Sequence, residues 1–269
     1  MGERIGIGIT GATGRMGRAL VAAVLAEPRA RLSAACVRPG SPEAGAPVLD
    51  AAGETTGVSL TEDGPAVFAA SDVVIDFSVP DVTAMFATLA AESGTPLVVG
   101  TTGLEAQEHA ALKRASAQAA ILQAANFSLG IHLLGRLVRE AAAALGEDFD
   151  IEILEMHHRH KRDAPSGTAR MLGHAAAKGR GLPADAADTA AARPDRAGPR
   201  ARGSLGFSVL RGGDVAGEHT VIFAGEQERL ELTHRATSRA IFARGAVAGA
   251  LWLAKQPAGL YALDDMMGA

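Results

Sequence analysis

Short apolar runs alternate with amphipathic stretches through the first half of the chain. The apolar runs have the length of buried strands and lie at 4–10, 32–37, 72–77, 96–100 and 119–123. The stretches between them have apolar residues at helical spacing and lie at 15–26, 80–93 and 105–117. This strand–helix–strand alternation predicts an α/β domain whose parallel sheet carries helices on both faces.

The second half follows another pattern and predicts helices over 129–145, from 166 onward and over 239–255. Strands are predicted over 150–156, 205–211, 218–224 and 229–235. Short turns join the last three strands, which favours antiparallel pairing among them. Residues 179–202 are rich in Ala, Pro, Gly and Arg, so we expect a long, mobile connection there. An α/β half followed by an α+β half indicates two domains.

Composition and charge narrow the function classes. The formal net charge of the 269-residue chain is −4 and only 4% of residues are aromatic. Nucleic acid is therefore not an expected partner, since there is neither an overall basic field nor a supply of stacking side chains. Cys36 is the only cysteine, so no intrachain disulfide can form. No run reaches the roughly 18 apolar residues of a membrane span, and the N-terminal run is too short and glycine-broken for a signal peptide. We expect a cytoplasmic protein without a membrane partner.

Two glycine patterns compete at the first strand–helix junction. Gly6-Ile-Gly-Ile-Thr-Gly11 matches the dinucleotide-binding pattern G-x-G-x-x-G, but only five residues precede it and its interior is strand-like. Gly11-Ala-Thr-Gly-Arg-Met-Gly17 instead follows a strand and opens a helix, as pyrophosphate binding requires. The N–H groups at Arg15 and Met16 would then hold phosphates. We favour the second pattern; the alternative is a tight turn without a ligand.

The residue that ends the second strand helps to select the cofactor. An Asp or Glu there would bind the ribose 2′-hydroxyl of NADH, but Ala35-Cys-Val-Arg38 contains no acid. Arg38 can pair with, or stack on, a 2′-phosphorylated adenosine. We therefore predict that NADPH is preferred and that NADH use is possible; the alternative is that Arg38 is only a solvated surface residue.

A basic loop precedes the helix predicted from residue 166. Six consecutive residues, 157–162, can carry positive charge. Pro165 favours an extended Ala164, and Ser166 can cap the helix. The N–H groups of Gly167 and Thr168 would then point at an anion. The pattern predicts a receptor for a carboxylate or a phosphate.

Three other interpretations of this loop stay open. It can be a solvated run of charge or a nucleic-acid contact. A metal site on His157, His158 and His160 is the third, although adjacent ligands rarely converge and no acidic or cysteine partner is evident. We expect no metal.

Five segments in order resemble one family, the 4-hydroxy-tetrahydrodipicolinate reductases of the diaminopimelate–lysine pathway, formerly called dihydrodipicolinate reductases. The likeness runs nearly end to end. The segments are Gly11-Ala-Thr-Gly-Arg-Met-Gly17, Val99-Gly-Thr-Thr-Gly103, Ala124-Ala-Asn-Phe-Ser128, Glu155-Met-His-His-Arg-His-Lys161 with Asp163-Ala-Pro-Ser-Gly-Thr168, and Gly217-Glu-His219.

The resemblance implies a domain plan and an activity. A Rossmann-like dinucleotide-binding domain would comprise residues 1–127 and 240–269. A central α+β domain with a mixed sheet would comprise residues 128–239, bind the substrate and form a homotetramer. The implied activity is NAD(P)H-dependent reduction of 4-hydroxy-tetrahydrodipicolinate, a small cyclic dicarboxylate, in lysine biosynthesis.

The resemblance also implies residue roles. His157 would be the catalytic acid/base and Lys161 its proton-donating partner. The substrate carboxylates would be held by His158, Lys161, Ser166, Gly167 and Thr168. Together with Arg38, the cofactor set would be Gly11, Ala12, Thr13, Gly14, Arg15, Met16, Gly100, Thr101, Thr102, Ala124, Ala125, Asn126 and Phe127.

The sequence departs from the family pattern at one informative place. Members that use both cofactors carry an acid where Val37 stands, which favours NADPH here. We do not match the arginine-rich segment 193–202 to the family pattern. Two other functions stay open: an amino-acid dehydrogenase on the same two-domain plan, and a non-enzymatic NADP-binding regulator. The regulator is less favoured because a sensor needs no proton donor.

Overall fold

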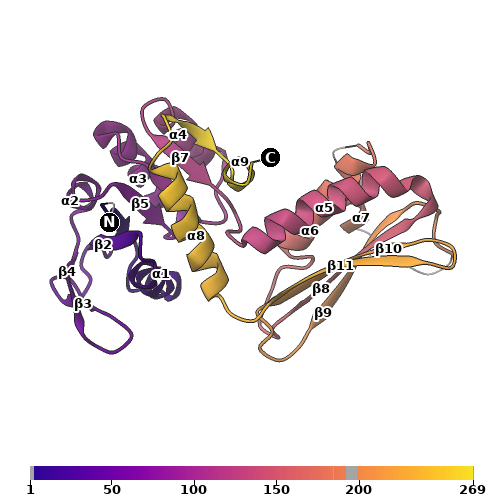
Figure 1. The fold of residues 1–269 in the computed structure, drawn as a ribbon, viewed down its shortest axis with the longest axis horizontal. Coiled ribbons are helices and arrows are strands. Elements are labelled where there is room, and N and C mark those ends of the chain that lie inside the picture. The colour runs from indigo at the N-terminus through magenta and orange to yellow at the C-terminus, as the bar shows by residue number, and fades with distance from the viewer. Residues whose placement is uncertain (1–2, 184, 192–198, 269) are drawn as a thin grey trace. The chain divides into compact units, whose positions relative to one another are not determined.

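The chain forms two compact units, each with its own hydrophobic core. The computed structural model describes residues 3–183, 185–191 and 199–268. Unit 1 consists of Met1–Phe127 together with Ala240–Ala269, and unit 2 of Ser128–Arg239. Figure 1 follows the chain from indigo at the N-terminus to yellow at the C-terminus.

Unit 1 is built on an eight-stranded sheet in the order β12-β7-β6-β5-β1-β2-β4-β3. Every neighbouring pair is parallel except the antiparallel pair β3 and β4. The strands are β1 (Ile5–Ile9), β2 (Ala30–Cys36), β3 (Pro47–Leu49), β4 (Thr55–Thr61), β5 (Val73–Asp76), β6 (Leu97–Val99), β7 (Ala120–Gln123) and β12 (Gly259–Tyr261). The predicted α/β class is confirmed.

Helices cover both faces of this sheet. On one face α1 (Arg15–Ala26) and α8 (Ala240–Leu253) pack against alternate strand residues such as Ile7 and Val98. On the other face lie α2 (Gly64–Ala69), α3 (Pro80–Ser93) and α4 (Ala106–Ala115). The short helix α9 (Leu263–Met266) follows β12. The C-terminal segment thus completes the N-terminal fold.

Several short elements of unit 1 were not predicted. They are β3, β4, α2, β12 and α9. In β4 only Leu60 is buried, so the strand lacks the continuous apolar run that marks the inner strands. Strand β3 has one buried residue, Val48, between two exposed ones, and β12 alternates between half-buried and exposed; three residues are too few for a periodicity signal.

Unit 2 packs helices on one face of a four-stranded sheet in the order β11-β10-β8-β9. Its strands are β8 (Asp150–His157), β9 (Leu205–Arg211), β10 (Gly217–Ala224) and β11 (Arg229–Ala236). Its helices are α5 (Leu129–Leu145), α6 (Gly167–Gly179), α7 (Ala186–Ala191) and a 3₁₀ turn, Gly146–Asp148. The pairs β8·β10 and β10·β11 are antiparallel whereas β8·β9 is parallel, so the predicted mixed sheet is confirmed.

Two predictions for unit 2 were wrong. The strands β9 and β10 do not pair, because β8 lies between them. Ile153 on β8 pairs with Phe207 on one side and Val221 on the other, and all three are buried in the core under the helices. Within the expected mobile connection, residues 186–191 form helix α7 with Ala187 fully buried; residues 192–198 lie outside the described residues.

Among the described residues, none of the helices combines the length and the apolar character that a membrane span needs.

Candidate active site

The glycine turn after β1 is built around close backbone approaches. Gly11 has φ +59°, a left-handed conformation that glycine adopts without strain. The N–H of Ala12 donates to the Cys36 carbonyl at 3.0 Å, and the N–H of Gly14 donates to the Gly11 carbonyl at 3.0 Å. A Cβ on Gly17 would lie 2.2 Å from the Gly11 oxygen, so only glycine lets α1 start this close to the turn.

The start of α1 fits a phosphate group. Its N-cap is Gly14, no side chain caps the first turn, and the first turn contains no acidic residue. The first N–H groups and the positive end of the helix dipole therefore have no competing partner from a capping side chain. The competing glycine pattern does not reach the helix, since Gly6 and Gly8 lie inside β1.

The other predicted cofactor segments follow neighbouring strands of the same sheet. Because β1, β5, β6 and β7 are parallel neighbours, the loops after them share one edge. A Cβ on Gly100 would lie 2.1 Å from Cζ of Phe77, and the Phe77 ring is 5.5 Å from the Phe127 ring, centre to centre. These contacts bring the loops after β5, β6 and β7 together.

A buried carboxylate organises this edge. Asp76, fully buried, accepts from the Thr10 hydroxyl at 2.6 Å and from the N–H of Ser78 at 3.0 Å. The hydroxyls of Thr83 and Thr101 lie 2.6 and 3.2 Å from its other oxygen. The Thr101 side chain thus faces the interior of unit 1.

The predicted cofactor residues differ in their exposure to solvent. Buried members of the set are Ala12, Gly100, Thr101, Ala124 and Phe127. Half-buried or exposed members are Gly11, Thr13, Gly14, Arg15, Met16, Arg38, Thr102, Ala125 and Asn126. The exposed group includes the turn at the start of α1, where a ligand is expected.

An acid does lie beside the end of β2, but it comes from another strand. Cys36 pairs with Thr61 at the end of the parallel strand β4, and Glu62 follows directly. Its carboxylate accepts the N–H of Gly40 at 2.9 Å, two residues after the exposed Arg38. The β2 segment itself contains no acid. Glu62, which follows the unpredicted strand β4, supplies one beside it.

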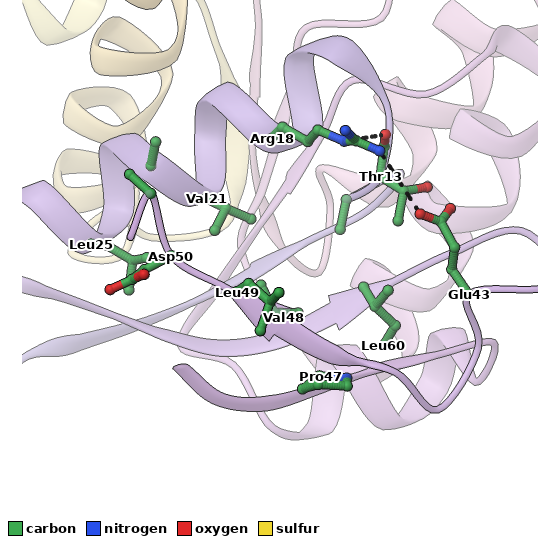
Figure 2. A pocket seen from close by; sticks show the side chains of 13 residues that line it. Thr13, Arg18, Val21, Leu25, Glu43, Pro47, Val48, Leu49, Asp50 and Leu60 are labelled. Carbon is green, nitrogen blue, oxygen red and sulfur yellow. Dashed lines mark hydrogen bonds and ion pairs between the residues drawn. The ribbon is translucent and has the colours of Figure 1, made fainter. Parts of the chain in front are cut away.

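A cavity of about 410 Å³ opens on the flank of α1 (Figure 2). Its apolar wall includes Val21 of α1 and Val48 of β3. At one end Arg18 donates to the Thr13 carbonyl at 3.0 Å and lies 3.8 Å from Glu43. Of the predicted cofactor residues only Ala12 and Thr13 line the cavity, so we do not assign it to the dinucleotide.

In unit 2 the end of β8 presents two functional side chains on one face. Glu155 and His157 are two residues apart on the strand, and both side chains point to the helix-covered face. Nδ1 of His157 is hydrogen-bonded to Oε2 of Glu155. The His157 side chain is 10% exposed and that of Glu155 is 0% exposed.

Glu155 is surrounded by donors. Arg211 of β9 donates to both of its oxygens, at 2.9 and 3.0 Å, and the N–H of Ser166 donates to Oε1 at 2.9 Å. Burial alone would raise the pKa of Glu155, but hydrogen bonds from His157, Arg211 and Ser166 outweigh burial and lower it to about 2. The carboxylate is therefore ionised at any physiological pH.

A second buried histidine meets His157 at an angle. The rings of His157 and His219 are 5.1 Å apart in an edge-to-face arrangement. Nε2 of His219 lies 3.1 Å from the Ser166 hydroxyl, which also caps α6 by accepting the N–H of Ala169. Burial, followed by the nearby charge of His157, lowers the pKa of His219 to about 4, so this ring is neutral at pH 7.

The predicted substrate residues cluster at the start of α6. Ser166 is 2% exposed and its polar atoms are engaged inside the unit, whereas Gly167 is exposed with nothing within 4 Å of a Cβ placed on it. Thr168 is half-buried, and the first turn of α6 contains no acid. The positive end of the α6 helix dipole therefore lies beside an exposed glycine and no first-turn acid, which suits an anion.

The loop between β8 and α6 carries Lys161 beside this helix start. Nζ of Lys161 lies 2.9 Å from Oδ1 of Asp163. His158 has its pKa lowered, first by partial loss of solvation and then by nearby positive charges, among which that of Arg239 is the largest. The loop thus gathers several positive charges around one acid, Asp163, which pairs with Lys161.

The three histidines considered for a metal do not converge as a set. Among the described residues, the group with metal-ligand geometry is instead Glu155, His157 and His219, whose ligand atoms lie within 4.8 Å of one another. Glu155 is thus an acidic partner of His157 that was not evident from the sequence. The carboxylate of Glu155 is already taken by donors, including the positive charge of Arg211, which disfavours a cation at this place.

Sequence reasoning missed Glu155, Arg211 and His219 as site residues. The spacing Glu155-x-His157 on a strand was a usable signal, because residues two apart share a face. Arg211 had no such signal, since the parallel pairing of β8 and β9 was not predicted.

Comparison with known proteins decides the family. Residues 5–127 match the family model described as dihydrodipicolinate reductase, N-terminus, and residues 130–267 match the one described as dihydrodipicolinate reductase, C-terminus. The chain belongs to the dihydrodipicolinate reductase family. The family suggested by the five sequence segments is thereby confirmed.

Full-length relatives agree with this assignment to the dihydrodipicolinate reductases. A 4-hydroxy-tetrahydrodipicolinate reductase of Cereibacter sphaeroides (strain KD131) is 50% identical over 272 residues, covering 100% of both chains. That of Halorhodospira halophila is 48% identical over 266 residues, 98% of this chain and 99% of its own. Such full-length relatives disfavour the dehydrogenase and regulator alternatives.

A solved dihydrodipicolinate reductase has the same fold. The structure from Paenisporosarcina sp. TG-14, which is dipicolinate-bound, matches with a TM-score of 0.77 at 22% identity, over 98% of this chain and 99% of that one. At this identity the likeness bears on the fold, and it extends over both units.

Proposed function

We propose that this dihydrodipicolinate reductase family member reduces 4-hydroxy-tetrahydrodipicolinate to tetrahydrodipicolinate with a nicotinamide dinucleotide. Full-length identity of 50% to a reductase of that name is the observation that carries the proposal. The anion-receiving start of α6 beside His157 and Lys161 supplies a chemical reason, since the substrate is a dicarboxylate. When bound, the dinucleotide supplies the hydride.

Unit 1 holds the dinucleotide in this proposal. The turn from Gly11 to Met16 binds the pyrophosphate through backbone N–H groups, because neither a capping side chain nor an acid competes there. The segments after β6 and β7, 100–102 and 124–127, border the nicotinamide half at the same sheet edge. Arg38 is exposed and favours a 2′-phosphate, so NADPH is preferred over NADH.

Unit 2 holds the substrate and moves the proton. The N–H groups of Gly167 and Thr168, with Lys161 and His158, bind the carboxylates. Because Nδ1 of His157 is engaged by Glu155, the proton that is transferred resides on Nε2. Lys161 stabilises the negative charge on the substrate that this proton neutralises. Asp163, which pairs with Lys161, gives up this contact when the substrate carboxylate binds.

The sheet of unit 2 also supports a homotetramer. Its face away from the helices carries Leu154, Met156 and Ile222, half-buried in the single chain, and Leu210, which is 49% exposed. The ion pair between Arg235 and Glu218 lies beside them. An apolar centre with a charged rim is typical of a subunit interface. We place the enzyme in the cytoplasm, which suits its single free, buried cysteine, Cys36.

A coupled assay tests the proposed function. The purified protein is given NADPH and the freshly formed product of dihydrodipicolinate synthase, and the loss of NADPH absorbance is followed. We expect rapid oxidation that depends on the synthase product. Oxidation with other oxo-acids but not with this product would instead favour a different dehydrogenase, and no oxidation with any of them would favour a regulator.

A further inference from the structure

One buried carboxylate contacts both halves of the proposed substrate site. Glu155 is hydrogen-bonded through Oε2 to Nδ1 of His157, the proposed proton donor. Through Oε1 it accepts the N–H of Ser166 at 2.9 Å, immediately before the helix start that would receive a carboxylate. The two oxygens of one side chain thus connect the proton-transfer group to the anion receptor.

Arg211 extends this connection to the loop that carries Lys161. Its guanidinium donates to both oxygens of Glu155 and, at 2.7 Å, to the Asp163 carbonyl. The carboxylate of Asp163 pairs with Nζ of Lys161 at 2.9 Å. Arg211 therefore holds Glu155 and, at the same time, the backbone of Asp163, the residue that pairs with Lys161.

The strand register delivers both charges to this point. Glu155 lies on the central strand β8, and Arg211 is the register partner of His157 on the parallel strand β9. The planar fork of an arginine then matches the two carboxylate oxygens. A lysine would offer a point charge and could not engage both oxygens and the Asp163 carbonyl in the same way.

A purely structural role explains this arrangement poorly. Removing a carboxylate and a guanidinium from water costs about as much as their attraction returns, and apolar residues of equal volume often stabilise a fold as well or better. Every atom of the Glu155 carboxylate is aimed at a group that the proposed reaction uses or at the arginine that holds it. Such a network specifies geometry more than it adds stability.

We infer that Glu155 and Arg211 form a positioning pair that fixes the His157 imidazole, with Nδ1 protonated and Nε2 directed to the substrate, in register with the start of α6. This inference rests on the proposed function and extends it. Neither residue touches the reacting atoms; both act through His157, Ser166 and the loop that holds Lys161.

The test compares Glu155→Gln with a matched change on the same strand. Gln keeps the size of Glu155, but its amide group offers donors where Arg211 and His157 need an acceptor. Glu152→Gln is the control, because Glu152 also lies on β8 and pairs with an arginine, Arg200, at 2.6 Å. We expect Glu155→Gln to lower kcat about 10²-fold and to raise KM for the dicarboxylate, with NADPH affinity unchanged. Glu152→Gln should keep kcat within about twofold of the wild type.

A spectroscopic readout separates positioning from general loss of structure. Nitrogen chemical shifts of ¹⁵N-histidine-labelled protein report the tautomer of His157. We expect the neutral His157 ring to be protonated on Nδ1 in the wild type, which leaves Nε2 to take up and then donate the transferred proton, and we expect a mixture of tautomers in Glu155→Gln. If Glu155→Gln does not fold, Glu155→Gln/Arg211→Gln removes both charges together; it should fold and still show the low kcat and the mixed tautomers.

Two results would overturn the inference while leaving the proposed function intact. One is wild-type kcat in Glu155→Gln or in the double variant, and the other is an unchanged His157 tautomer in both. Failure of the proposed function looks different, because the wild-type protein itself would then not oxidise NADPH with the synthase product. In that event the tautomer measurement and titration with dipicolinate as the probe still test the positioning of His157 and α6.

Discussion

Gly217 lies directly against the imidazole of His157. A Cβ on Gly217 would approach Nε2 to 3.0 Å and Cδ2 to 3.3 Å. Since Nδ1 is hydrogen-bonded to Glu155, Nε2 is the nitrogen that the proposed reaction would use, and the absence of a side chain at Gly217 keeps its surroundings open. The close approach of the His157 ring thus explains why a glycine stands first in the Gly217-Glu-His219 segment.

Substituting this glycine tests that reason. Gly217→Ala should lower kcat by at least about tenfold, because the methyl group displaces the imidazole from its position. Gly135→Ala is the matched control: the nearest neighbour of its new Cβ is 3.8 Å away, an ordinary contact, and alanine favours the helix. Steady-state kinetics and circular dichroism on both variants provide the measurement. Equal kcat in Gly217→Ala and the wild type would contradict the account.

The buried His219 predicts a loss of stability in mild acid. Its pKa is lowered from 6.5 to about 4, so the unfolded chain binds a proton at higher pH than the folded one. Stability is therefore complete above about pH 6.5 and falls as the pH drops toward 4, by about 3 kcal/mol from this residue. Glu155, with its pKa lowered from 4.5 to about 2, adds a second loss below that window.

Denaturant titrations at fixed protein concentration measure this loss. His219→Gln should remove the contribution of about 3 kcal/mol that His219 makes between pH 6.5 and 4, while His234, whose pKa burial also lowers, keeps its own contribution. His109→Gln, which replaces an exposed histidine on α4, should leave that pH dependence as in the wild type. If the free energy of unfolding falls equally with pH in the wild type and in His219→Gln over this range, His219 is not the group responsible.

Cofactor preference is expected to depend on Arg38. Arg38→Ala should weaken NADPH binding about tenfold and NADH binding less than twofold, because only NADPH has the 2′-phosphate that a guanidinium engages. Titration calorimetry at moderate salt gives both dissociation constants. Arg31→Ala is the control: Arg31 is an exposed arginine near the start of β2, the strand that precedes Arg38, and it pairs with Asp72. Equal wild-type affinity for the two cofactors would contradict the predicted preference, and Glu62 beside Gly40 would then be the residue to examine.

Assembly through the open sheet face predicts a dissociating variant. Ile222→Lys places a charge at the apolar centre of that face and should convert tetramers to smaller species. Met85→Lys, at a residue 50% exposed on α3 of unit 1, should leave the assembly unchanged. Light scattering coupled to size-exclusion chromatography measures both masses. A monomeric wild type, or an intact Ile222→Lys tetramer, would rule out this interface.

The sequence was most informative where local signals are strong. Helix 80–93 and the boundaries of α5 follow from apolar spacing, with Ser128 capping α5 through its side chain. The choice between two glycine patterns is explained by the 2.2 Å approach that Gly17 permits. Such features depend on neighbours in the chain and can be inferred from it.

Features that depend on distant pairing could not be inferred in the same way. Turn lengths suggested that β9 pairs with β10, but β8 lies between them and pairs with both. That insertion is what brings Arg211 to Glu155, so the error in topology hid the positioning pair. In unit 1 the short strand β4 was missed, and with it the acid at Glu62.

We propose above that His157 donates the proton in reduction of the dicarboxylate. The most direct test is the NADPH-oxidation assay with the synthase product on the wild type, His157→Ala and Lys161→Ala, alongside dipicolinate titration of each protein. We predict that the wild type turns over and that kcat is lower by roughly 10²-fold or more in each variant. His157→Ala should still bind dipicolinate. Near-normal turnover in both variants would contradict it.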